Sequence, residues 1–213
     1  MRDYQREFID FAITTGAIRF GEFTLKSGRV SPYFFNAGQF NTGHRLGRLG
    51  QYYAQTIIDS GIKFDMLFGP AYKGIPLATA TAIALSGHVD RDIPFAFDRK
   101  EKKQHGEGGR IVGHPLEGRV LIIDDVISSG ISVNGAVDII RDANARPGGV
   151  VIAVDRQEKG SADTSAVQEV ESTHNLSVTS IIKLETLIQY LKDSDGLEQH
   201  LQPIEAYRSK YGV

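Results

Sequence analysis

The chain has 213 residues, a formal net charge of −2 and no cysteine. This length fits one large domain, or one domain with a small lobe, and the charge excludes a globally basic body built to hold nucleic acid. The lack of cysteine excludes a disulfide framework, a thiolate metal site and a cysteine nucleophile, and it fits a cytoplasmic protein. The first residues lack the apolar region of a signal peptide, and no apolar run is long enough for a bilayer, so we expect no membrane partner.

The first sixty residues predict an N-terminal lobe with much β-structure. Aromatic residues recur at helical spacing over residues 3–14, which predicts an amphipathic helix with Asp3 as a possible N-cap. Over residues 17–36 the pattern changes to short β-type runs broken by glycine, which predicts a hairpin-rich hood. A second helix is expected over residues 42–59.

A regular alternation of strands and helices follows. Short apolar runs that are apolar on both faces indicate a parallel sheet covered by helices on both sides, and therefore an α/β fold. We predict one domain in which residues 1–60 are mainly the hood and residues 61–185 the core. The predicted strands cover 64–68, 94–97, 119–123, 149–154 and 178–182, and the predicted helices cover 74–85, 133–143, 165–174, 185–192 and 197–211.

Residues 99–115 stand apart because they combine many basic residues with four glycines. No apolar period runs through this segment until Ile111, which favours a loop. A long loop inside a compact domain is usually functional or disordered. A solvated surface loop is the simpler reading of these residues taken alone.

The strongest chemical signal is the run Val120-Leu-Ile-Ile-Asp-Asp-Val-Ile-Ser-Ser-Gly-Ile-Ser132. It predicts a buried strand whose carboxyl end delivers Asp124 and Asp125, followed by a turn of small residues and a helix. Ligands of open α/β sheets bind at the carboxyl ends of strands. Backbone N–H groups at the start of the helix, over residues 128–132, form an anion site. Carboxylate acceptors beside phosphate donors suit a sugar phosphate, whereas an ordinary capped βα unit explains this order poorly.

This run resembles the phosphoribosyl-diphosphate signature of type I phosphoribosyltransferases. Three more runs resemble the orotate phosphoribosyltransferase family: residues 20–36 its substrate lobe, 68–76 its pyrophosphate loop and 98–109 its mobile catalytic loop. With residues 155–160, the resemblance extends from the first helix to the last. It implies the type I phosphoribosyltransferase fold, a central parallel sheet flanked by helices with an N-terminal β-rich hood, in a single domain.

The resemblance also implies an activity. Members transfer the ribose 5-phosphate group from 5-phospho-α-D-ribose 1-diphosphate (phosphoribosyl diphosphate) to orotate, giving orotidine 5′-phosphate and diphosphate in pyrimidine biosynthesis. Mg²⁺ is expected on the diphosphate and the ribose hydroxyls, with few direct protein ligands. A homodimer with shared active sites is expected as well, in which residues 99–115 form the mobile catalytic loop. No nucleic-acid partner is expected.

The same resemblance assigns roles to individual residues. Catalytic roles fall to Lys26, Lys103, Asp124 and Asp125. Binding of phosphoribosyl diphosphate or its pyrophosphate also involves Tyr72, Lys73, Arg99, Lys100 and His105. The sugar and 5′-phosphate site extends through Val126, Ile127, Ser128, Ser129, Gly130, Ile131 and Ser132, and the orotate pocket involves Phe34, Phe35, Ser128 and Arg156. Taken singly, a solvated turn lysine, core aromatics or surface residues explain several of these positions, so their joint order carries the assignment.

Three local expectations follow from the comparison with the family pattern. Threonine is frequent where Ser128 stands, which keeps a hydroxyl. A small hydroxyl residue is usual where Ile131 stands, so backbone donors should carry the 5′-phosphate here. By resemblance, the peptide bond between Ala71 and Tyr72 is expected to be cis, although such bonds are rare without proline.

Competing functions predict other sequence features. A purine or another pyrimidine phosphoribosyltransferase would share the acid pair, but not both the Lys26 lobe and the lysine-rich loop. A non-catalytic regulator that senses phosphoribosyl diphosphate on the same fold would need a winged-helix extension or a basic face, and the first sixty residues supply neither. A P-loop kinase is excluded because the chain has no G-x-x-x-x-G-K-[ST] run.

Overall fold

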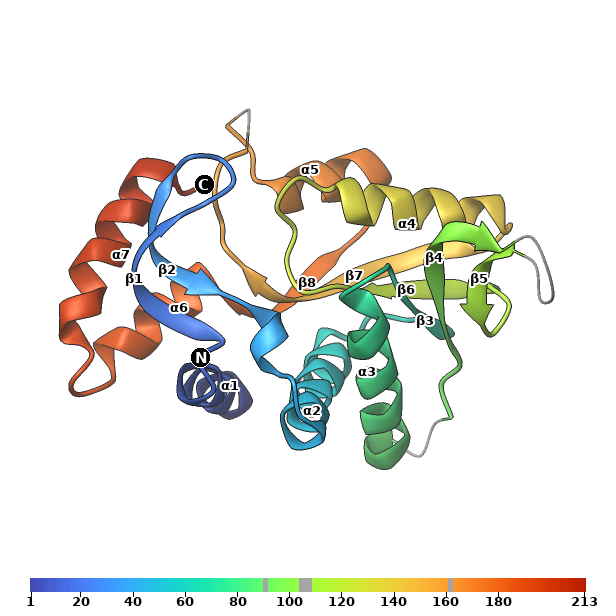
Figure 1. The fold of residues 1–213 in the computed structure, drawn as a ribbon, viewed down its shortest axis with the longest axis horizontal. Helices are drawn as coiled ribbons and strands as arrows, with labels where there is room; N and C mark the ends of the chain where they lie inside the picture. Colours follow the sequence, from blue (N-terminus) through green and yellow to red (C-terminus); the bar gives the residue numbers. More distant parts are fainter. Residues whose placement is uncertain (90–91, 104–108, 161–162) are drawn as a thin grey trace.

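The computed structural model describes residues 1–89, 92–103, 109–160 and 163–213, with the backbone alone at residues 88, 89, 102, 103 and 109. Helices and strands alternate around a central sheet (Figure 1). The elements are α1 (Asp3–Thr14), β1 (Ile18–Thr24), β2 (Val30–Phe35), the short 3₁₀ helix η1 (Ala37–Gln39), α2 (Gly43–Ser60), β3 (Met66–Gly69), α3 (Gly74–Val89), β4 (Phe95–Lys103), β5 (Gly109–Gly113), β6 (Arg119–Ile123), α4 (Ile131–Asp142), β7 (Arg146–Asp155), α5 (Ala166–His174), β8 (Val178–Lys183), α6 (Leu184–Lys192) and α7 (Glu198–Tyr211).

The central sheet has six strands in the order β5-β4-β3-β6-β7-β8. Strands β4, β3, β6, β7 and β8 are parallel, and only the edge strand β5 runs antiparallel, against β4. Helices α4 and α5 cover one face, while α2 and α3 cover the other with α1 beside them (Figure 1). The predicted α/β fold is therefore confirmed, with one antiparallel strand added at the edge.

Burial of the central strands explains their continuous apolar runs. In β6, Leu121 and Ile123 belong to the core on the side of α1, α2 and α3, whereas Val120 and Ile122 belong to the core on the side of α4 and α5. All four side chains are fully buried. Successive side chains of a strand point to opposite faces, so a strand buried on both faces has no polar alternation.

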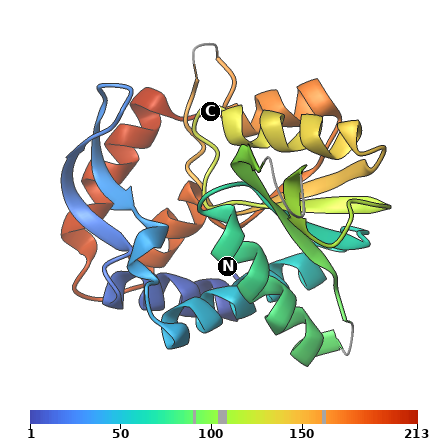
Figure 2. The ribbon, with the colours of Figure 1, turned by 45° about the vertical axis from the view of Figure 1, so that its right-hand side comes forward.

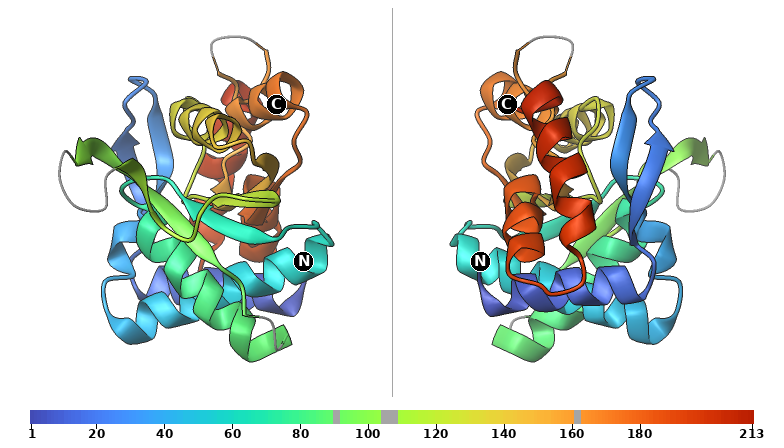
Figure 3. Two further views of the ribbon diagram at one scale, coloured as in Figure 1. Left: turned by 90° about the vertical axis from the view of Figure 1, so that its right-hand side faces the viewer. Right: turned by 90° about the vertical axis from the view of Figure 1, so that its left-hand side faces the viewer.

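The hood is the antiparallel pair β1 and β2, which lies beside α7 and apart from the main sheet (Figure 2). The turn between the strands closes with a hydrogen bond from the Leu25 N–H to the Arg29 carbonyl, at 2.8 Å. Gly28 in this turn has a φ of 80°, a conformation that glycine adopts without steric cost. Helices α6 and α7 pack against each other on the outer side of the hood (Figure 3).

Three sequence expectations differ from the structure. Asp3 is the first residue of α1 and not its N-cap, because Arg2 precedes the helix and donates its N–H to Gln5 Oε1 at 3.0 Å. Part of the predicted loop 99–115 is a two-stranded antiparallel ribbon, because β4 extends to Lys103 and pairs with β5. The strands are joined by backbone hydrogen bonds and carry charged side chains, so no apolar period marked them in the sequence. Helix α2, placed with the hood by its position in the sequence, packs against α3 and the main sheet. Among the described residues no helix is long and apolar enough to cross a membrane.

Candidate active site

The acid pair follows directly after β6, at the carboxyl end of a central strand, as predicted. The Asp124 N–H donates to the Val151 carbonyl of β7 at 3.1 Å, and the Ala153 N–H donates to the Asp125 carbonyl at 2.9 Å. From α2, the Tyr53 hydroxyl donates to the Asp124 carbonyl at 2.7 Å. The turn is thus held from two neighbouring elements, and each carboxylate also accepts a backbone N–H of the turn: Asp124 Oδ1 from Asp125 and Asp125 Oδ1 from Val126, both at 2.9 Å.

The two carboxylates differ in their surroundings, although both are nearly buried, with 6% and 5% exposure. Burial and, to a smaller extent, the neighbouring charge of Asp125 raise the pKa of Asp124 to about 6, against the lowering effect of hydrogen bonds with Ser132 and the Asp125 backbone and of the Lys73 charge. The Lys73 amine forms an ion pair and a hydrogen bond with Asp125. A lysine after β3 therefore meets an aspartate after β6, which places a cation beside the acid pair.

The segment after the acid pair forms an anion cradle. Gly130 is the N-cap of α4 with a φ of 70°, and its carbonyl accepts the first helical hydrogen bond from the Asn134 N–H at 2.8 Å. Ser128, Ser129 and Ser132 are exposed, and Ile131 is 75% exposed. A cavity of about 460 Å³ lies against this turn, and its lining includes Pro70, Ala71, Asp98, Lys100, Arg110 and residues 126–133.

The turn between β3 and α3 borders the same cavity. Its Ala71–Tyr72 peptide bond is cis, which confirms the expectation from the family pattern. A side chain at Gly69 would come within 2.1 Å of the Gly74 carbonyl oxygen, and one at Gly74 within 2.8 Å of the Ile123 carbonyl oxygen. These two glycines therefore let the start of α3 approach the ends of β3 and β6 closely.

Two charged residues that line the cavity, Asp98 and Arg110, were not among the predicted site residues. The Ala71 N–H donates to Asp98 Oδ1 at 2.6 Å, and Arg110 Nη2 lies 3.5 Å from Asp98 Oδ2. Asp98 is 6% exposed. Asp98 follows the apolar residues of β4, just as Asp124 follows those of β6. The sequence pattern that identified Asp124 could therefore have identified Asp98 as well. In the sequence Arg110 was one of several basic residues of its segment. Only the pairing of β4 with β5 shows that Arg110, on β5, lies beside Asp98.

The structure describes some of the site residues predicted in and after β4 and not others. Arg99 is half-buried and Lys100 is exposed, with the Lys100 amine 4.7 Å from the centre of the Tyr72 ring. Tyr72 itself is 67% exposed. The side chain of Lys103 and the whole of His105 lie outside the described residues.

The predicted hood residues occupy different surroundings. Lys26 is exposed in the turn between β1 and β2. The Phe34 ring stacks on Phe23 with ring centres 5.5 Å apart, and Phe35 is 8% exposed within the core. The Phe34 ring is therefore half-buried against Phe23, whereas the Phe35 ring is buried in the core.

Arg156 follows β7 directly, next to the strand end that carries the acid pair. Its Nη2 donates to Ser31 Oγ of β2 at 2.9 Å. The side chain of Arg156 is 17% exposed. A hydrogen bond between β2 and the end of β7 therefore joins the hood to the main sheet at the predicted orotate site.

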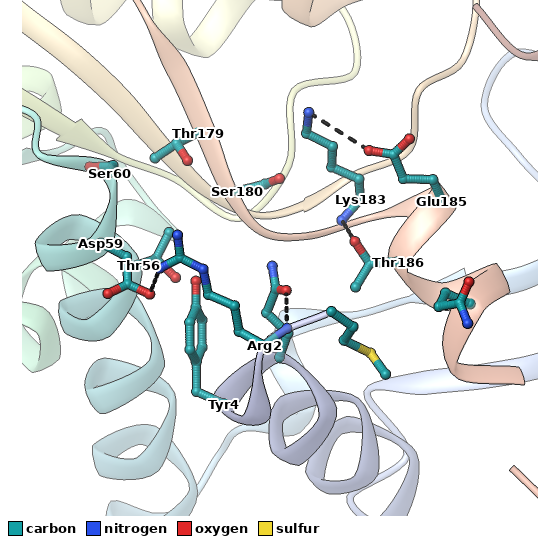
Figure 4. A pocket seen from close by; sticks show the side chains of 13 residues that line it. Arg2, Tyr4, Thr56, Asp59, Ser60, Thr179, Ser180, Lys183, Glu185 and Thr186 are labelled. Carbon is teal, nitrogen blue, oxygen red and sulfur yellow. Dashed lines mark hydrogen bonds and ion pairs between the residues drawn. The ribbon is translucent and has the colours of Figure 1, made fainter. Parts of the chain in front are cut away.

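A second pocket, of about 580 Å³, lies away from the acid pair where α1, α2, β8 and α6 meet (Figure 4). Its cations are matched by acids within the pocket, since Arg2 pairs with Asp59 and the Lys183 amine lies 4.0 Å from Glu185. This pocket lies away from the carboxyl ends of β3 and β6 and from the start of α4, where ligands of open α/β sheets bind. The smaller cavity beside Asp124 and the start of α4 is therefore the candidate active site.

Acids at the end of a central strand, an anion cradle at the following helix and a hood beside them define a class of sugar-phosphate enzymes. A model of the "Phosphoribosyl transferase domain" matches residues 36–184. The chain belongs to the phosphoribosyltransferase family.

Full-length relatives narrow the comparison. The chain is 60% identical to "Orotate phosphoribosyltransferase" of Thioalkalivibrio sulfidiphilus and 58% identical to that of Pseudomonas syringae pv. tomato, each match covering 100% of both chains. Among solved structures, it is similar to the crystal structure of orotate phosphoribosyltransferase from Francisella tularensis, with a TM-score of 0.88 and 44% identity over 97% of this chain and 100% of that one.

Proposed function

We propose that the chain is an orotate phosphoribosyltransferase, which transfers the ribose 5-phosphate group of phosphoribosyl diphosphate to orotate in pyrimidine biosynthesis. The observation that carries this proposal is the buried pair Asp124 and Asp125 beside an anion cradle, in a chain whose full-length relatives bear that enzyme name. The same relatives favour catalysis over a non-catalytic regulator on this fold.

The acid pair and the basic residues divide the work of the reaction. Displacement at the anomeric carbon builds positive charge on the ribose and negative charge on the departing diphosphate. Asp124 and Asp125 hold ribose hydroxyls and favour the cationic sugar. Preorganised charges that face the developing charge stabilise such a transition state. The groups assigned to the diphosphate are Lys26, Tyr72, Lys73, Arg99, Lys100, Lys103 and His105.

The remaining groups bind the two ends of the substrates. Backbone N–H groups and hydroxyls bind the 5′-phosphate at the start of α4, with Val126, Ile127, Ser128, Ser129, Gly130, Ile131 and Ser132 lining the site. Arg156 binds the orotate carboxylate, since a guanidinium forms paired hydrogen bonds with a carboxylate. Ser128, Phe34 and Phe35 complete the orotate pocket. The two additional cavity residues, Asp98 and Arg110, hold the turn at Ala71 in place.

Magnesium is proposed as the cofactor, carried mainly by the diphosphate and the ribose hydroxyls. The donor set fits this arrangement: Asp124 and Asp125 offer oxygen atoms of the type that Mg²⁺ prefers, but the Lys73 amine already binds Asp125. When bound, Mg²⁺ supplies charge neutralisation at the leaving group. The protein contributes the acids that orient the hydroxyls and the lysines that hold the diphosphate.

A homodimer with shared sites is proposed as the working form. Helix α3 is apolar around most of its circumference, and on its outer side Pro76 is exposed and Ile83 is 68% exposed. An exposed apolar helix face is typical of a protein–protein contact. The ribbon of β4 and β5 extends from the same edge of the sheet and would carry Lys103 toward a partner. The cytoplasmic location and the absence of a nucleic-acid partner stay predictions from the sequence.

The proposed activity is tested by the loss of orotate absorbance after phosphoribosyl diphosphate and Mg²⁺ are added to the purified protein. We expect turnover with orotate and none with hypoxanthine, adenine or uracil under the same conditions. Turnover with one of those bases in place of orotate would assign another phosphoribosyltransferase. Binding of phosphoribosyl diphosphate without turnover, together with a gel shift of DNA or RNA, would assign the regulator.

Replacing Ile131 by threonine tests the backbone cradle. Ile131 is 75% exposed at the first residue of α4, so a threonine hydroxyl there faces the cavity without disturbing the core. One new hydrogen bond to the 5′-phosphate should tighten phosphoribosyl diphosphate by about 1 kcal/mol, measured by calorimetry. Ile131→Val is the matched control, because it keeps the shape near the backbone and adds no donor. An unchanged affinity in Ile131→Thr would show that backbone donors already satisfy the phosphate.

A further inference from the structure

The guanidinium of Arg156 is held by an acid two residues further along the chain. Its Nε donates to Glu158 Oε1 at 2.8 Å, and its Nη2 lies 2.5 Å from the same oxygen. The two side chains are only 17% and 14% exposed. Solvent therefore screens this pair weakly, and its geometry is fixed by packing as well as by charge.

The pattern of donors leaves one part of the guanidinium available. Arginine has one N–H on Nε and two on each of Nη1 and Nη2. Glu158 and Ser31 engage Nε and Nη2, and the described residues give Nη1 no hydrogen bond of normal geometry. The buried Tyr207 hydroxyl is a further polar neighbour of both Arg156 and Glu158. The centre of the guanidinium lies 4.2 Å from the centre of the Tyr33 ring, which supports its plane. The two N–H groups of Nη1 therefore remain for an anion.

Glu158 is itself held by the C-terminal residues. It forms an antiparallel bridge with Gly212. On either side, the Lys159 N–H donates to the Tyr211 carbonyl at 2.8 Å, and the Val213 N–H donates to the Gln157 carbonyl at 3.1 Å. The end of α7 and the residues after it thus fix the short segment that carries Glu158.

The hood holds the same segment from the other side. Arg29, in the turn between β1 and β2, donates from Nη1 to the Lys159 carbonyl at 2.8 Å. The Arg29 guanidinium also lies 4.9 Å from the centre of the Tyr211 ring. The segment after Arg156 is therefore clamped between the hood and the C-terminus, two parts of the chain that are far apart in sequence.

We propose that Glu158 is a positioning residue for the carboxylate of the pyrimidine substrate, an inference that rests on the proposed function. By occupying Nε and Nη2 it leaves Nη1 as the part of Arg156 that meets this carboxylate. The C-terminal residues Tyr211–Val213 take part by holding Glu158. A long side chain that is ordered before the substrate arrives loses less conformational freedom on binding, so the clamp favours orotate over a pyrimidine without a carboxylate.

A different role for Glu158 would change the orotate affinity in the opposite direction. If Glu158 only neutralised Arg156, it would compete with the substrate carboxylate, and its removal would tighten orotate binding. The geometry favours positioning, because Glu158 does not engage Nη1 and its loss would leave a buried arginine free to turn away from its present plane. The two roles are therefore separated by the direction of the change in orotate affinity.

The test compares Glu158→Ala with Glu158→Gln. Alanine removes the acceptor, and we expect the KM for orotate to rise about tenfold, the usual effect of losing one charge-assisted hydrogen bond, while the KM for phosphoribosyl diphosphate stays the same. Glutamine keeps an acceptor oxygen in the same place and should restore most of the orotate affinity. Glu205→Ala is the matched control, since Glu205 lies on α7 and pairs with Lys192 at the surface; both KM values should be unchanged.

A chain that ends at Tyr211 provides a second variant, which should raise the KM for orotate in the same direction because it releases the segment of Glu158. An orotate KM that is unchanged or lower in Glu158→Ala, or that rises equally for both substrates, would overturn the inference. A Gln variant as poor as the Ala variant would also overturn it. If the unaltered protein neither binds nor converts orotate, the proposed function fails instead.

Discussion

Two inactive variants should restore activity to each other if the active site is shared between subunits. Lys103→Ala and Asp125→Asn are each expected to be nearly inactive, since one removes a cation at the diphosphate and the other an acid at the ribose. After co-refolding, a mixed dimer would have one site with both defects and one site with none. Random pairing makes half of the dimers mixed, each with one good site of two, so about a quarter of the activity should return in a two-fold dimer.

The structure indicates why Lys103 and Asp125 can act from different chains. The beginning of β4 belongs to its own subunit's site, because Asp98 binds the Ala71 N–H and Lys100 lies beside Tyr72. Lys103 lies five residues after Asp98 along β4, which places the two roughly 16 Å apart along the strand. The ribbon therefore leads away from the site of its own subunit.

The complementation needs a control in which both defects lie on the same side of the shared site. Asp124→Asn co-refolded with Asp125→Asn should stay inactive, because neither site of the mixed dimer then contains an intact acid pair. Formation of mixed dimers is checked by a size tag on one partner. If Lys103→Ala and Asp125→Asn form mixed dimers that remain inactive, the ribbon serves its own chain and the shared-site proposal is wrong.

Asp124→Asn is expected to abolish most activity and at the same time to stabilise the folded protein. The activity should fall by a factor of about 100 or more, since a charged contact to the developing cationic sugar is lost. The pKa of the buried Asp124 carboxyl is raised from 3.8 to about 6. Its ionised form is thus disfavoured in the folded protein, and each pKa unit corresponds to about 1.4 kcal/mol.

The direction of the pH dependence follows from this shift. The unfolded chain loses the Asp124 proton near pH 3.8 and the folded protein near pH 6, so between these values the folded state binds more protons and its stability falls as pH rises. At about pH 8 the asparagine variant should therefore have a free energy of unfolding higher by up to about 3 kcal/mol. This advantage should shrink through pH 6 and vanish below about pH 4.

Urea unfolding across this pH range measures the effect. Asp138→Asn is the matched control, because Asp138 is an exposed residue of α4 and its replacement should change neither activity nor the pH profile. A stability difference that is independent of pH, or an asparagine variant less stable than the unaltered protein at pH 8, would show that Lys73 and the turn around Asp124 compensate the buried charge. Active sites often carry such a cost in stability.

Much of the candidate site could be predicted because short stretches of sequence determine it. The apolar run before Asp124 identifies a buried strand, and the small residues after Asp125 identify a turn into a helix. A strand end followed by a helix start places acids and backbone donors within a few residues of each other, whatever the rest of the chain does. For the same reason the positions of Lys73, after β3, and of Arg156, after β7, follow from the order of strands and helices.

Other features depend on contacts between distant residues. The outer part of the β4–β5 ribbon carries charged side chains. Its backbone pairing therefore produces no alternation of apolar and polar residues that the sequence could show. The role of Asp98 at Ala71 needs two neighbouring strand ends to meet. Phe34 and Phe35 are assigned to the orotate pocket by the family pattern, but their rings pack on Phe23 and in the core.

The clamp around Arg156 shows the same division most clearly. Sequence alone determined that an arginine follows a buried strand at the sheet edge where ligands bind. Only the tertiary structure decided which of its donors remain for a substrate, because Ser31 of the hood and Glu158 take the others. The residues that fix Glu158 come from the C-terminus and from the hood turn. A local pattern can state what a strand end carries, whereas the orientation of a side chain depends on every element that packs against it.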